Sequence, residues 1–484
     1  MLALFAILQL LLCCSSFNLH QRASKAISRQ FMWPFKSEEQ QSYGPSSFVE
    51  IAPSWEDLEA LLRDKEDPVE RKEYDDELLG RGYANHRASI RLFDAPDGFE
   101  PEVTLYRDQA AWCPYCEKVW LQLEEKRIPY KVEKAPLRCY GEKTREFLLV
   151  SPRGMLPVGI VKGRTISESN DIMSTLESSF PDHNPLLPNQ EADLDLYRQV
   201  TPLLQLERKS FSIWFSWLTG GRDMSRQMDS VLQEVDDALA SNDGPYFLGR
   251  MFSLVDIMFA PFLERMAASL PYFKGFESRS NKYPHLLKWY EAMDKRPAYQ
   301  GIKSDYYTHC HDLPPQIGGC VSTPTSKKYS QEIDGGCWDL QVDPSSMLEP
   351  MIPSDKGIAT RDAVRRSLGN KEKLVKFACR GVGKRGSPGV SAELADPNAK
   401  SGEEYIPAVD SALRLVMLSM LEGTMAVEQR LVEKQDALPI QAISESLKYL
   451  RDRIGVPRDM TVHAAQQFRA NINWLLTYIA SSAV

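Results

Sequence analysis

The sequence predicts an α/β domain followed by two all-α regions, and three patterns along the chain support this prediction. Short β-branched and aromatic runs alternate with helical periods between residues 103 and 180. Beyond Pro185 the apolar residues recur at helical spacing. A stretch rich in proline, glycine and serine, Pro314–Pro353, is expected to be loop, and it precedes a last helical region.

Within the α/β part, strands and helices alternate in a definite order. Strands are expected at 103–106, 129–132, 156–161 and 164–166, with Lys162 and Gly163 as a two-residue turn. Helices are expected at 115–127, 143–150 and 168–180. This β-α-β-α-β-β-α order is that of a thioredoxin-type fold, which places Cys113 and Cys116 at the start of its first helix.

The later part of the chain shows two groups of helical periods and no internal repeat. The first group covers 192–217, 223–240, 254–270 and 285–293. The second group covers 359–378, 405–421, 440–453 and 461–479. Both groups predict helices that bury one apolar face.

Composition places the chain among ordinary globular proteins. It has 484 residues, of which 43% are hydrophobic and 26% charged, so it is long enough for several domains with real cores. The formal net charge of −8 argues against a nucleic-acid binder. Nine cysteines at irregular spacing do not form a disulfide scaffold, and a largely reduced protein is expected.

The first 37 residues differ from the rest of the chain. Leu2–Cys14 is an apolar run shorter than the ~20 residues of a membrane span, followed by the small residues Ser15 and Ser16. A basic, serine-bearing stretch then runs over 17–30. This order resembles the two-part leaders of plastid proteins in algae with complex plastids; a simple secretory signal is the alternative. Nothing later is apolar enough to span a membrane, so no span is expected in the mature chain.

Residues 38–99 form a polar, acidic stretch. Ser54 followed by Glu56 and Asp57 is typical of a helix start, and Leu58 and Leu62 follow at helical spacing. We expect either an extension packed on the body or a partly ordered linker, with no chemistry of its own.

The stretch Ala110–Trp120 contains the pair Cys113 and Cys116, which suits a metal site, a structural disulfide or a reactive thiol. A zinc site needs a second pair of ligands at compatible spacing. The other cysteines form no such pair, and the cluster Tyr307–His311 has no Cys-x-x-Cys nearby. No metal is therefore expected.

A strand-turn-helix setting favours a reactive thiol at Cys113. A cysteine at a helix N-terminus faces free N–H groups and the positive end of the helix dipole, which together favour the thiolate. Pro114 fits the first helical turn, and Lys118 adds a nearby positive charge. Cys116 lies about one turn further along and is expected to be the more buried, resolving thiol.

The motif Trp112–Cys116 (WCPYC) resembles glutaredoxins, and the whole region 103–180 with the helices after it resembles cysteine-type glutathione S-transferases such as the omega class. Three further motifs carry the resemblance: Met155–Val158, Glu168 with Ser169, and Ser253–Asp256. The order of these motifs with a long C-terminal extension resembles a plant and algal group of such proteins.

The resemblance implies glutathione as co-substrate and assigns residues to it. Leu156 and Pro157 correspond to the cis-proline loop that pairs with the cysteinyl backbone, and Glu168 and Ser169 to the pair that receives the γ-glutamyl end. Tyr115 is expected at the rim of the site. Segment 134–144 departs from the family's usual loop. Lys143 is therefore the expected lysine contact, with Arg138 as a competitor.

The fold implies an acceptor pocket beside the first helix of the second domain. Phe211, Trp214 and Phe215, with Trp217, are candidates to line it, although an aromatic stripe at helical spacing also suits plain core. The helices after 355 are expected to pack on the body or to form a homodimer contact. The small basic, glycine-rich loop 380–386 is expected to be solvated rather than a phosphate site.

The resemblance therefore predicts a glutathione-dependent thiol transferase or reductase that acts on a small electrophile or a disulfide. Alternatives are a non-catalytic module with this fold, and an isomerase like the prostaglandin synthase with the same dithiol site. The expected segments are a targeting leader (1–37), a polar N-terminal extension (38–99), a thioredoxin-like glutathione-binding domain (100–183), a helical transferase domain (184–303), a loop-rich linker (304–354) and a helical C-terminal extension (355–484).

Overall fold

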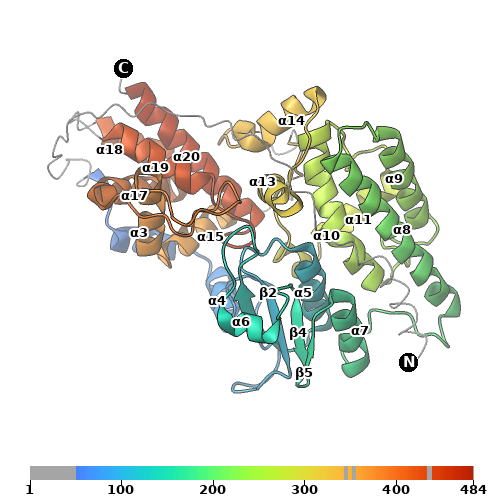
Figure 1. The fold of residues 1–484 in the computed structure, drawn as a ribbon. Helices are drawn as coiled ribbons and strands as arrows, with labels where there is room; N and C mark the ends of the chain where they lie inside the picture. Colours follow the sequence, from blue (N-terminus) through green and yellow to red (C-terminus); the bar gives the residue numbers. More distant parts are fainter. Residues whose placement is uncertain (1–50, 343–346, 351–355, 433–438, 483–484) are drawn as a thin grey trace.

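The computed structural model describes residues 51–342, 347–350, 356–432 and 439–482. The expected leader, residues 1–37, lies outside the described residues. Figure 1 shows a small sheet between two groups of helices, one formed by α8–α11 and the other by the C-terminal helices. Among the described residues, no helix is both long and apolar enough to cross a membrane.

The sheet has the strand order β1-β3-β2-β4-β5. Its strands are β1 (Ile90–Arg91), β2 (Val103–Asp108), β3 (Tyr130–Ala135), β4 (Val158–Val161) and β5 (Arg164–Ile166). Strands β2 and β3 run parallel, whereas β2 with β4 and β4 with β5 run antiparallel. Leu105 in the centre of β2 is opposite both Val132 and Gly159 and is fully buried.

Helices cover both faces of this sheet. They are α5 (Pro114–Lys126), α6 (Arg145–Val150) and α7 (Ser169–Ser179). On the α6 side, Phe147 packs against Ala135 and Val158 in a small core of its own. The predicted thioredoxin-like order is confirmed, with β1 as an added edge strand that the sequence did not indicate.

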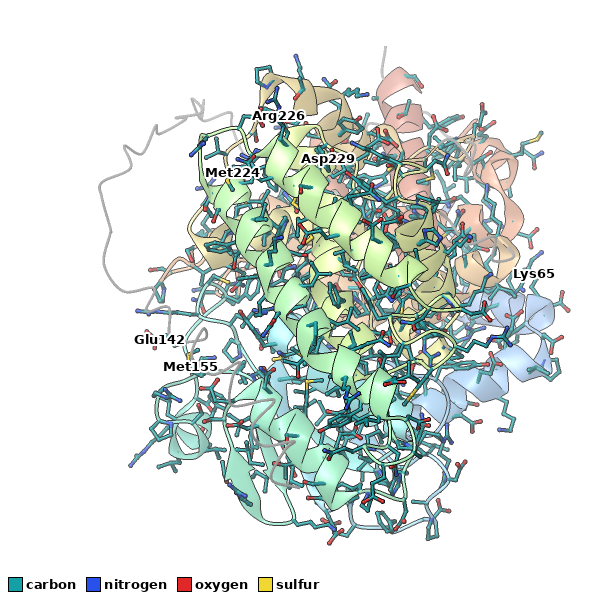
Figure 2. All side chains as sticks on the ribbon, turned by 90° about the vertical axis from the view of Figure 1, so that its right-hand side faces the viewer. Lys65, Glu142, Met155, Met224, Arg226 and Asp229 are labelled. Atoms are coloured by element: carbon teal, nitrogen blue, oxygen red, sulfur yellow. The ribbon has the colours of Figure 1, made fainter. Side chains whose placement is uncertain are left out.

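The helical region that follows is built around one central helix. It contains α8 (Leu194–Thr219), α9 (Ser225–Ala240), α10 (Leu254–Ser269), α11 (Pro284–Asp294), α12 (Pro297–Gln300) and α13 (Tyr306–Ile317). Every residue of α10 is buried. The predicted capping box is present, since Ser253 N donates to Asp256 Oδ2 over 2.9 Å. Figure 2 views the molecule onto α8 and α9, where Asp229 accepts a hydrogen bond from the Tyr283 hydroxyl (2.5 Å).

The C-terminal helices form a second core that includes the start of the described chain. They are α15 (Lys356–Leu368), α16 (Lys371–Ala378), α17 (Ile406–Glu422), α18 (Thr424–Val432), α19 (Ile440–Arg451) and α20 (Val462–Ser482). Helix α3 (Trp55–Lys65) inserts Leu58 and Leu62 into this core, and α4 (Pro68–Leu78) follows it. The polar N-terminal extension is therefore a packed segment where the structure describes it.

The prediction of loop for Pro314–Pro353 is wrong over much of its first half. Helix α13 continues through Pro314 and Pro315, and α14 (Lys327–Gln331) lies within the stretch. Both prolines fall in the last turn of α13, and each lacks the N–H that would donate to the carbonyl oxygen four residues back, so the helix forms without two of its hydrogen bonds. Burial of Tyr307 and Cys310 on the same helix favours the helical state.

Candidate active site

The turn between β2 and α5 presents the two thiols. Cys113 is the N-cap residue of α5, and Pro114 occupies the first helical position. The Asp108 carboxylate at the end of β2 accepts a hydrogen bond from Trp112 N over 2.6 Å. Ala111 has a φ of 56°, so the chain reverses sharply between the strand and the helix. The strand-turn-helix setting expected for Cys113 is confirmed.

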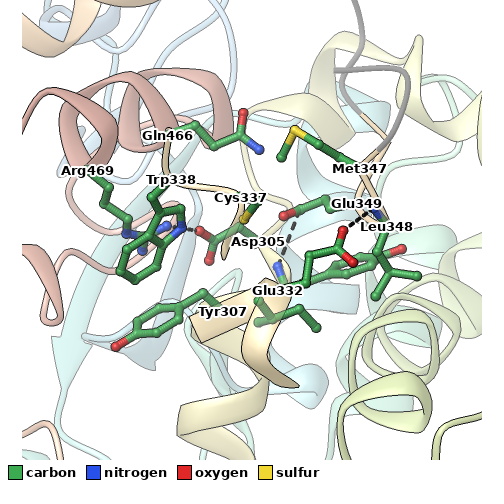
Figure 3. A pocket seen from close by; sticks show the side chains of 12 residues that line it. Asp305, Tyr307, Glu332, Cys337, Trp338, Met347, Leu348, Glu349, Gln466 and Arg469 are labelled. Atoms are coloured by element: carbon green, nitrogen blue, oxygen red, sulfur yellow. Dashed lines mark hydrogen bonds and ion pairs between the residues drawn. The ribbon is translucent and has the colours of Figure 1, made fainter. Parts of the chain in front are cut away.

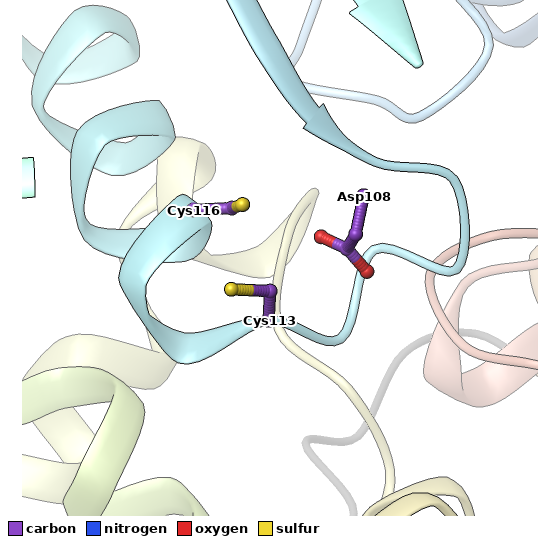
Figure 4. Close-up of side chains that lie close together, drawn as sticks. All are labelled: Asp108, Cys113 and Cys116. Atoms are coloured by element: carbon purple, nitrogen blue, oxygen red, sulfur yellow. The ribbon is translucent and has the colours of Figure 1, made fainter. Parts of the chain in front are cut away.

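Asp108, Cys113 and Cys116 converge on one point, with their oxygen and sulfur atoms all within 4.8 Å of one another (Figure 4). Cys113 is 6% exposed and Cys116 is 1% exposed. Burial raises the pKa of Cys116 well above its usual value, and the hydrogen bond with Cys113 raises it further. The thiol nearer the surface is therefore the one free to meet a substrate first.

Lys118 places a buried amino group beside this turn. Its Nζ donates to Asn170 Oδ1 over 2.6 Å and lies 3.6 Å from Met258 Sδ. Burial, with the charge of Arg208, lowers the pKa of Lys118 to about 7. The side chain thus links the dithiol helix to α7 and α10 and carries a proton that is easily lost.

A buried ion pair ties the dithiol helix to the central helix α10. Arg265 Nη1 lies 2.8 Å from Glu117 Oε2, and the same guanidinium donates to the carbonyl oxygens of Trp112 and Pro261. Arg265 and Glu117 are 1% and 4% exposed. Because Trp112 directly precedes Cys113, this guanidinium fixes the backbone from which the first thiol projects.

The cluster at 307–311 has a structural place next to this ion pair. His309 Nε2 lies 2.5 Å from Glu264 Oε1, and Glu264 also accepts hydrogen bonds from Ser304 N and the Tyr299 hydroxyl. His309 is fully buried in α13, not in a loop as expected. It therefore joins α13 to α10.

The proline loop leads into β4, whose Val158 is opposite Tyr106, near the end of β2 that leads to the dithiol turn. The Leu156–Pro157 peptide bond is cis. Ser151 Oγ donates to the Met155 carbonyl oxygen and accepts from Met155 N, each over 3.1 Å. These two bonds hold the loop that the sequence assigned to glutathione backbone.

Glu168 and Ser169 open helix α7, as predicted. Glu168 is the N-cap residue and is exposed. Its carboxylate lies 3.3 Å from Arg153 Nη2, which stands just before the proline loop. Arg153 is a residue that the sequence did not single out, because no local pattern marks it as a partner of Glu168.

Lys143 lies against the proline loop, whereas Arg138 is exposed. Lys143 Cδ lies 3.1 Å from the position that a Cβ atom would take on Gly154, whose φ is +64°. Lys143 Nζ donates to the Pro136 carbonyl oxygen over 2.6 Å. Burial lowers the pKa of Lys143, and the charges of Cys116 and Cys113 act in the opposite direction.

The comparisons with known proteins agree with this geometry. The model of the glutathione S-transferase N-terminal domain matches residues 112–179, and that of the C-terminal domain matches residues 221–292. The two matches follow one another in the order of the two domains of glutathione S-transferases. The match to the first domain begins at the dithiol turn and ends with helix α7.

Relatives match the transferase part of the chain. Glutathione S-transferase L1 of Arabidopsis thaliana is 28% identical over 213 residues, which are 44% of this chain and 86% of that protein. The protein named glutathione S-transferase DHAR3, chloroplastic, of the same species is 26% identical over 198 residues, 40% of this chain and 69% of that protein. The crystal structure of Chlamydomonas reinhardtii dehydroascorbate reductase is 26% identical, covers 42% of this chain and 92% of that chain, and has a TM-score of 0.35.

An aromatic wall stands beside the dithiol turn and is made of Tyr115, Phe211, Phe215 and Phe262. The ring centroids of Phe211 and Phe262 are 5.0 Å apart, and those of Tyr115 and Phe262 are 6.0 Å apart. Tyr115 is 39% exposed, which agrees with a place at the rim. Phe262 was missed from the sequence because every residue of its helix is buried, so no periodic pattern distinguishes one face.

Two of the four aromatic candidates on α8 lie inside the helical core. Trp214 is 2% exposed and donates its indole N–H to Ser269 Oγ over 3.0 Å. Trp217 is 3% exposed and packs edge-on against Phe276. Phe211 and Phe215 are half-buried and stacked, with centroids 5.7 Å apart. An acceptor pocket on α8 therefore depends on Phe211 and Phe215.

Proposed function

We propose that this transferase is a glutathione-dependent thiol transferase or reductase in which Cys113 forms a mixed disulfide with glutathione. The observation that carries the proposal is the convergence of Cys113, Cys116 and Asp108 at the N-terminus of α5. A cysteine at the start of this helix is suited to form a bond with the glutathione sulfur, which favours a reductive over a conjugating activity.

In the proposed reaction the Cys113 thiolate attacks the glutathione sulfur of a mixed disulfide. A Cys113–glutathione disulfide forms, and the other sulfur leaves as a thiolate that takes up a proton. A second glutathione thiolate then attacks this disulfide, which yields oxidised glutathione and regenerates Cys113. The substrate loses only its glutathione group, and its sulfur gains two electrons from the thiols.

The buried thiol provides a second route to the same end. Cys116 attacks Cys113 Sγ, glutathione leaves, and an intramolecular disulfide forms, which two further glutathione molecules reduce. Cys116 must lose its proton for this attack, although burial raises its pKa. The Asp108 carboxylate, within 4.8 Å of Cys116 Sγ, is the group placed to accept that proton.

Glutathione itself is proposed to bind between the proline loop and helix α7. The backbone of Leu156 would pair with the cysteinyl part as an added strand. The N-terminus of α7 with Ser169 would receive the γ-glutamyl carboxylate, and Glu168 the amino group. Retention of Glu168 and Ser169 favours this role over the isomerase alternative. The aromatic wall is proposed to contact the acceptor.

We also propose that the protein is located in a plastid and that it forms a homodimer. The leader pattern over 1–37 and a relative named as chloroplastic support the location. Fluorescent fusion of residues 1–37, imaged in an algal cell with a complex plastid, tests it. Signal in the secretory pathway alone would contradict the plastid proposal.

The reaction is tested by turnover of a glutathionylated peptide with reduced glutathione, for the wild type, Cys113→Ser and Cys116→Ser. We expect Cys113→Ser to lose at least about 100-fold in kcat, because the neighbouring thiol of Cys116 is 1% exposed and its pKa is raised well above the usual value. We expect Cys116→Ser to keep turnover through the second glutathione. Equal activity of wild type and Cys113→Ser would refute the proposal.

A further inference from the structure

The chain beyond residue 303, which includes α13 and is here called the extension, reaches the loop that carries Lys143. Residues 136–144, here called the Lys143 loop, contact two segments that lie beyond the family match. From α13, Gln316 Nε2 donates to Cys139 Sγ over 2.6 Å, and Asp312 accepts a hydrogen bond from the Tyr140 hydroxyl. From the segment 383–402, Ala392 N donates to the Cys139 carbonyl oxygen over 3.1 Å.

These contacts are buried and belong to the core of the transferase. Cys139 is 5% exposed and Ala392 is 4% exposed, and both lie in the same hydrophobic cluster as the dithiol helix. Leu394 packs against that cluster as well. The extension therefore closes over the middle of the Lys143 loop.

The two segments that hold the loop are themselves fixed. The segment 383–402 is closed at its base, since Lys384 and Lys400 exchange two backbone hydrogen bonds of 3.0 and 2.9 Å. Helix α13 begins at Asp305, whose carboxylate pairs with Arg469 of α20 (Figure 3). That pair is buried, with both side chains at most 2% exposed.

The position of Lys143 depends on these contacts with Cys139 and Tyr140, here called the loop contacts. Lys143 follows Tyr140 by three residues. Its side chain packs on Gly154, which precedes Leu156 by two residues. Its Nζ returns to the Pro136 carbonyl oxygen, which closes the loop on itself. A loop held at Cys139 and Tyr140 and closed from Lys143 to Pro136 has little freedom to move its ammonium group.

We propose that the extension is part of the glutathione site, because Gln316, Asp312 and Ala392 hold the Lys143 loop where Lys143 binds a carboxylate of glutathione. These three are positioning residues, and the inference rests on the function proposed above.

The test is a double-mutant cycle on the KM for glutathione. The double variant Gln316→Met/Tyr140→Phe, here called the contact variant, removes two hydrogen bonds that hold the loop. Lys143→Gln removes the ammonium group. We expect each change to raise the KM for glutathione by about 5- to 10-fold. The combination should raise it no further, because the loop contacts affect binding only by positioning Lys143. Gln331→Met, on exposed α14, is the matched control.

Two more readouts separate this inference from its alternatives. In the contact variant, Cys113 should be alkylated by iodoacetamide at the wild-type rate. Amide hydrogen exchange of residues 139–144 should be faster than in the wild type. An unchanged KM for glutathione in the contact variant would overturn the role of the extension, and so would effects on KM that are fully additive with Lys143→Gln. A wild type that takes up no glutathione would instead refute the proposed function, and this inference with it.

Discussion

Replacement of Lys118 by methionine should stabilise the protein and slow its thiol chemistry. Lys118 is 2% exposed, and burial lowers its pKa from 10.5 to about 7. Because one unit of pKa corresponds to about 1.4 kcal/mol, the folded protein loses at most about 5 kcal/mol at or below pH 7 by burying this group. Methionine fills the same space without a charge and gives up the hydrogen bond to Asn170, worth about 1 kcal/mol.

The gain should depend on pH in a defined direction. The unfolded chain keeps the Lys118 proton up to about pH 10.5, whereas the folded chain releases it near pH 7. The wild type is therefore stabilised relative to Lys118→Met as pH rises across that interval. We expect the variant to be more stable by about 3–4 kcal/mol near pH 6.5 and by about 1 kcal/mol near pH 9.

Thermal unfolding followed by circular dichroism at these two pH values measures the difference, with Lys288→Met, at an exposed position of α11, as the matched control. The same variant should react more slowly with iodoacetamide near pH 7, because the charges of Lys118 and Cys113 interact in the folded protein and the variant lacks that interaction. A variant less stable than the wild type near pH 6.5, or a difference that does not change with pH, would refute the reasoning.

Two further predictions concern the two cores. Arg265→Met removes the buried guanidinium that pairs with Glu117 and donates to the carbonyl oxygens of Trp112 and Pro261, and it should cost about 3–5 kcal/mol; unfolding by urea measures this, and a cost below that of the exposed control Lys295→Met would contradict it. Leu58→Ala removes a fully buried side chain from the C-terminal core and should cost about 2–5 kcal/mol. Limited proteolysis should then cleave among α15–α20 first, and cleavage that starts in the transferase domains would contradict the assignment of α3 to that core.

Much of the dithiol site could be predicted because its signals are local. The cap at Cys113, Pro114 after it and the alternating run before it lie within a dozen residues. The capping box at Ser253 and Asp256 is equally local. Such patterns depend on backbone chemistry that neighbouring residues supply, so they survive in a single sequence.

The unpredicted parts depend on contacts between distant segments. Cys139 and Gln316 are 177 residues apart, and nothing in the sequence around either one indicates the other. Strand β1 has two residues and gains its place from pairing with β3. Helix α13 forms despite Pro314 and Pro315 because its other face is buried, which propensity alone does not indicate.

The central claim is that Cys113 takes up glutathione, and the mass of the intact protein after incubation with oxidised glutathione tests it most directly. The chain from about residue 40 onward would be compared with its Cys113→Ser and Cys116→Ser variants. We expect one bound glutathione to accumulate in Cys116→Ser and to be absent from Cys113→Ser, with the wild type passing on to an internal disulfide. No adduct in any of the three proteins, or an adduct that persists in Cys113→Ser, would contradict the claim.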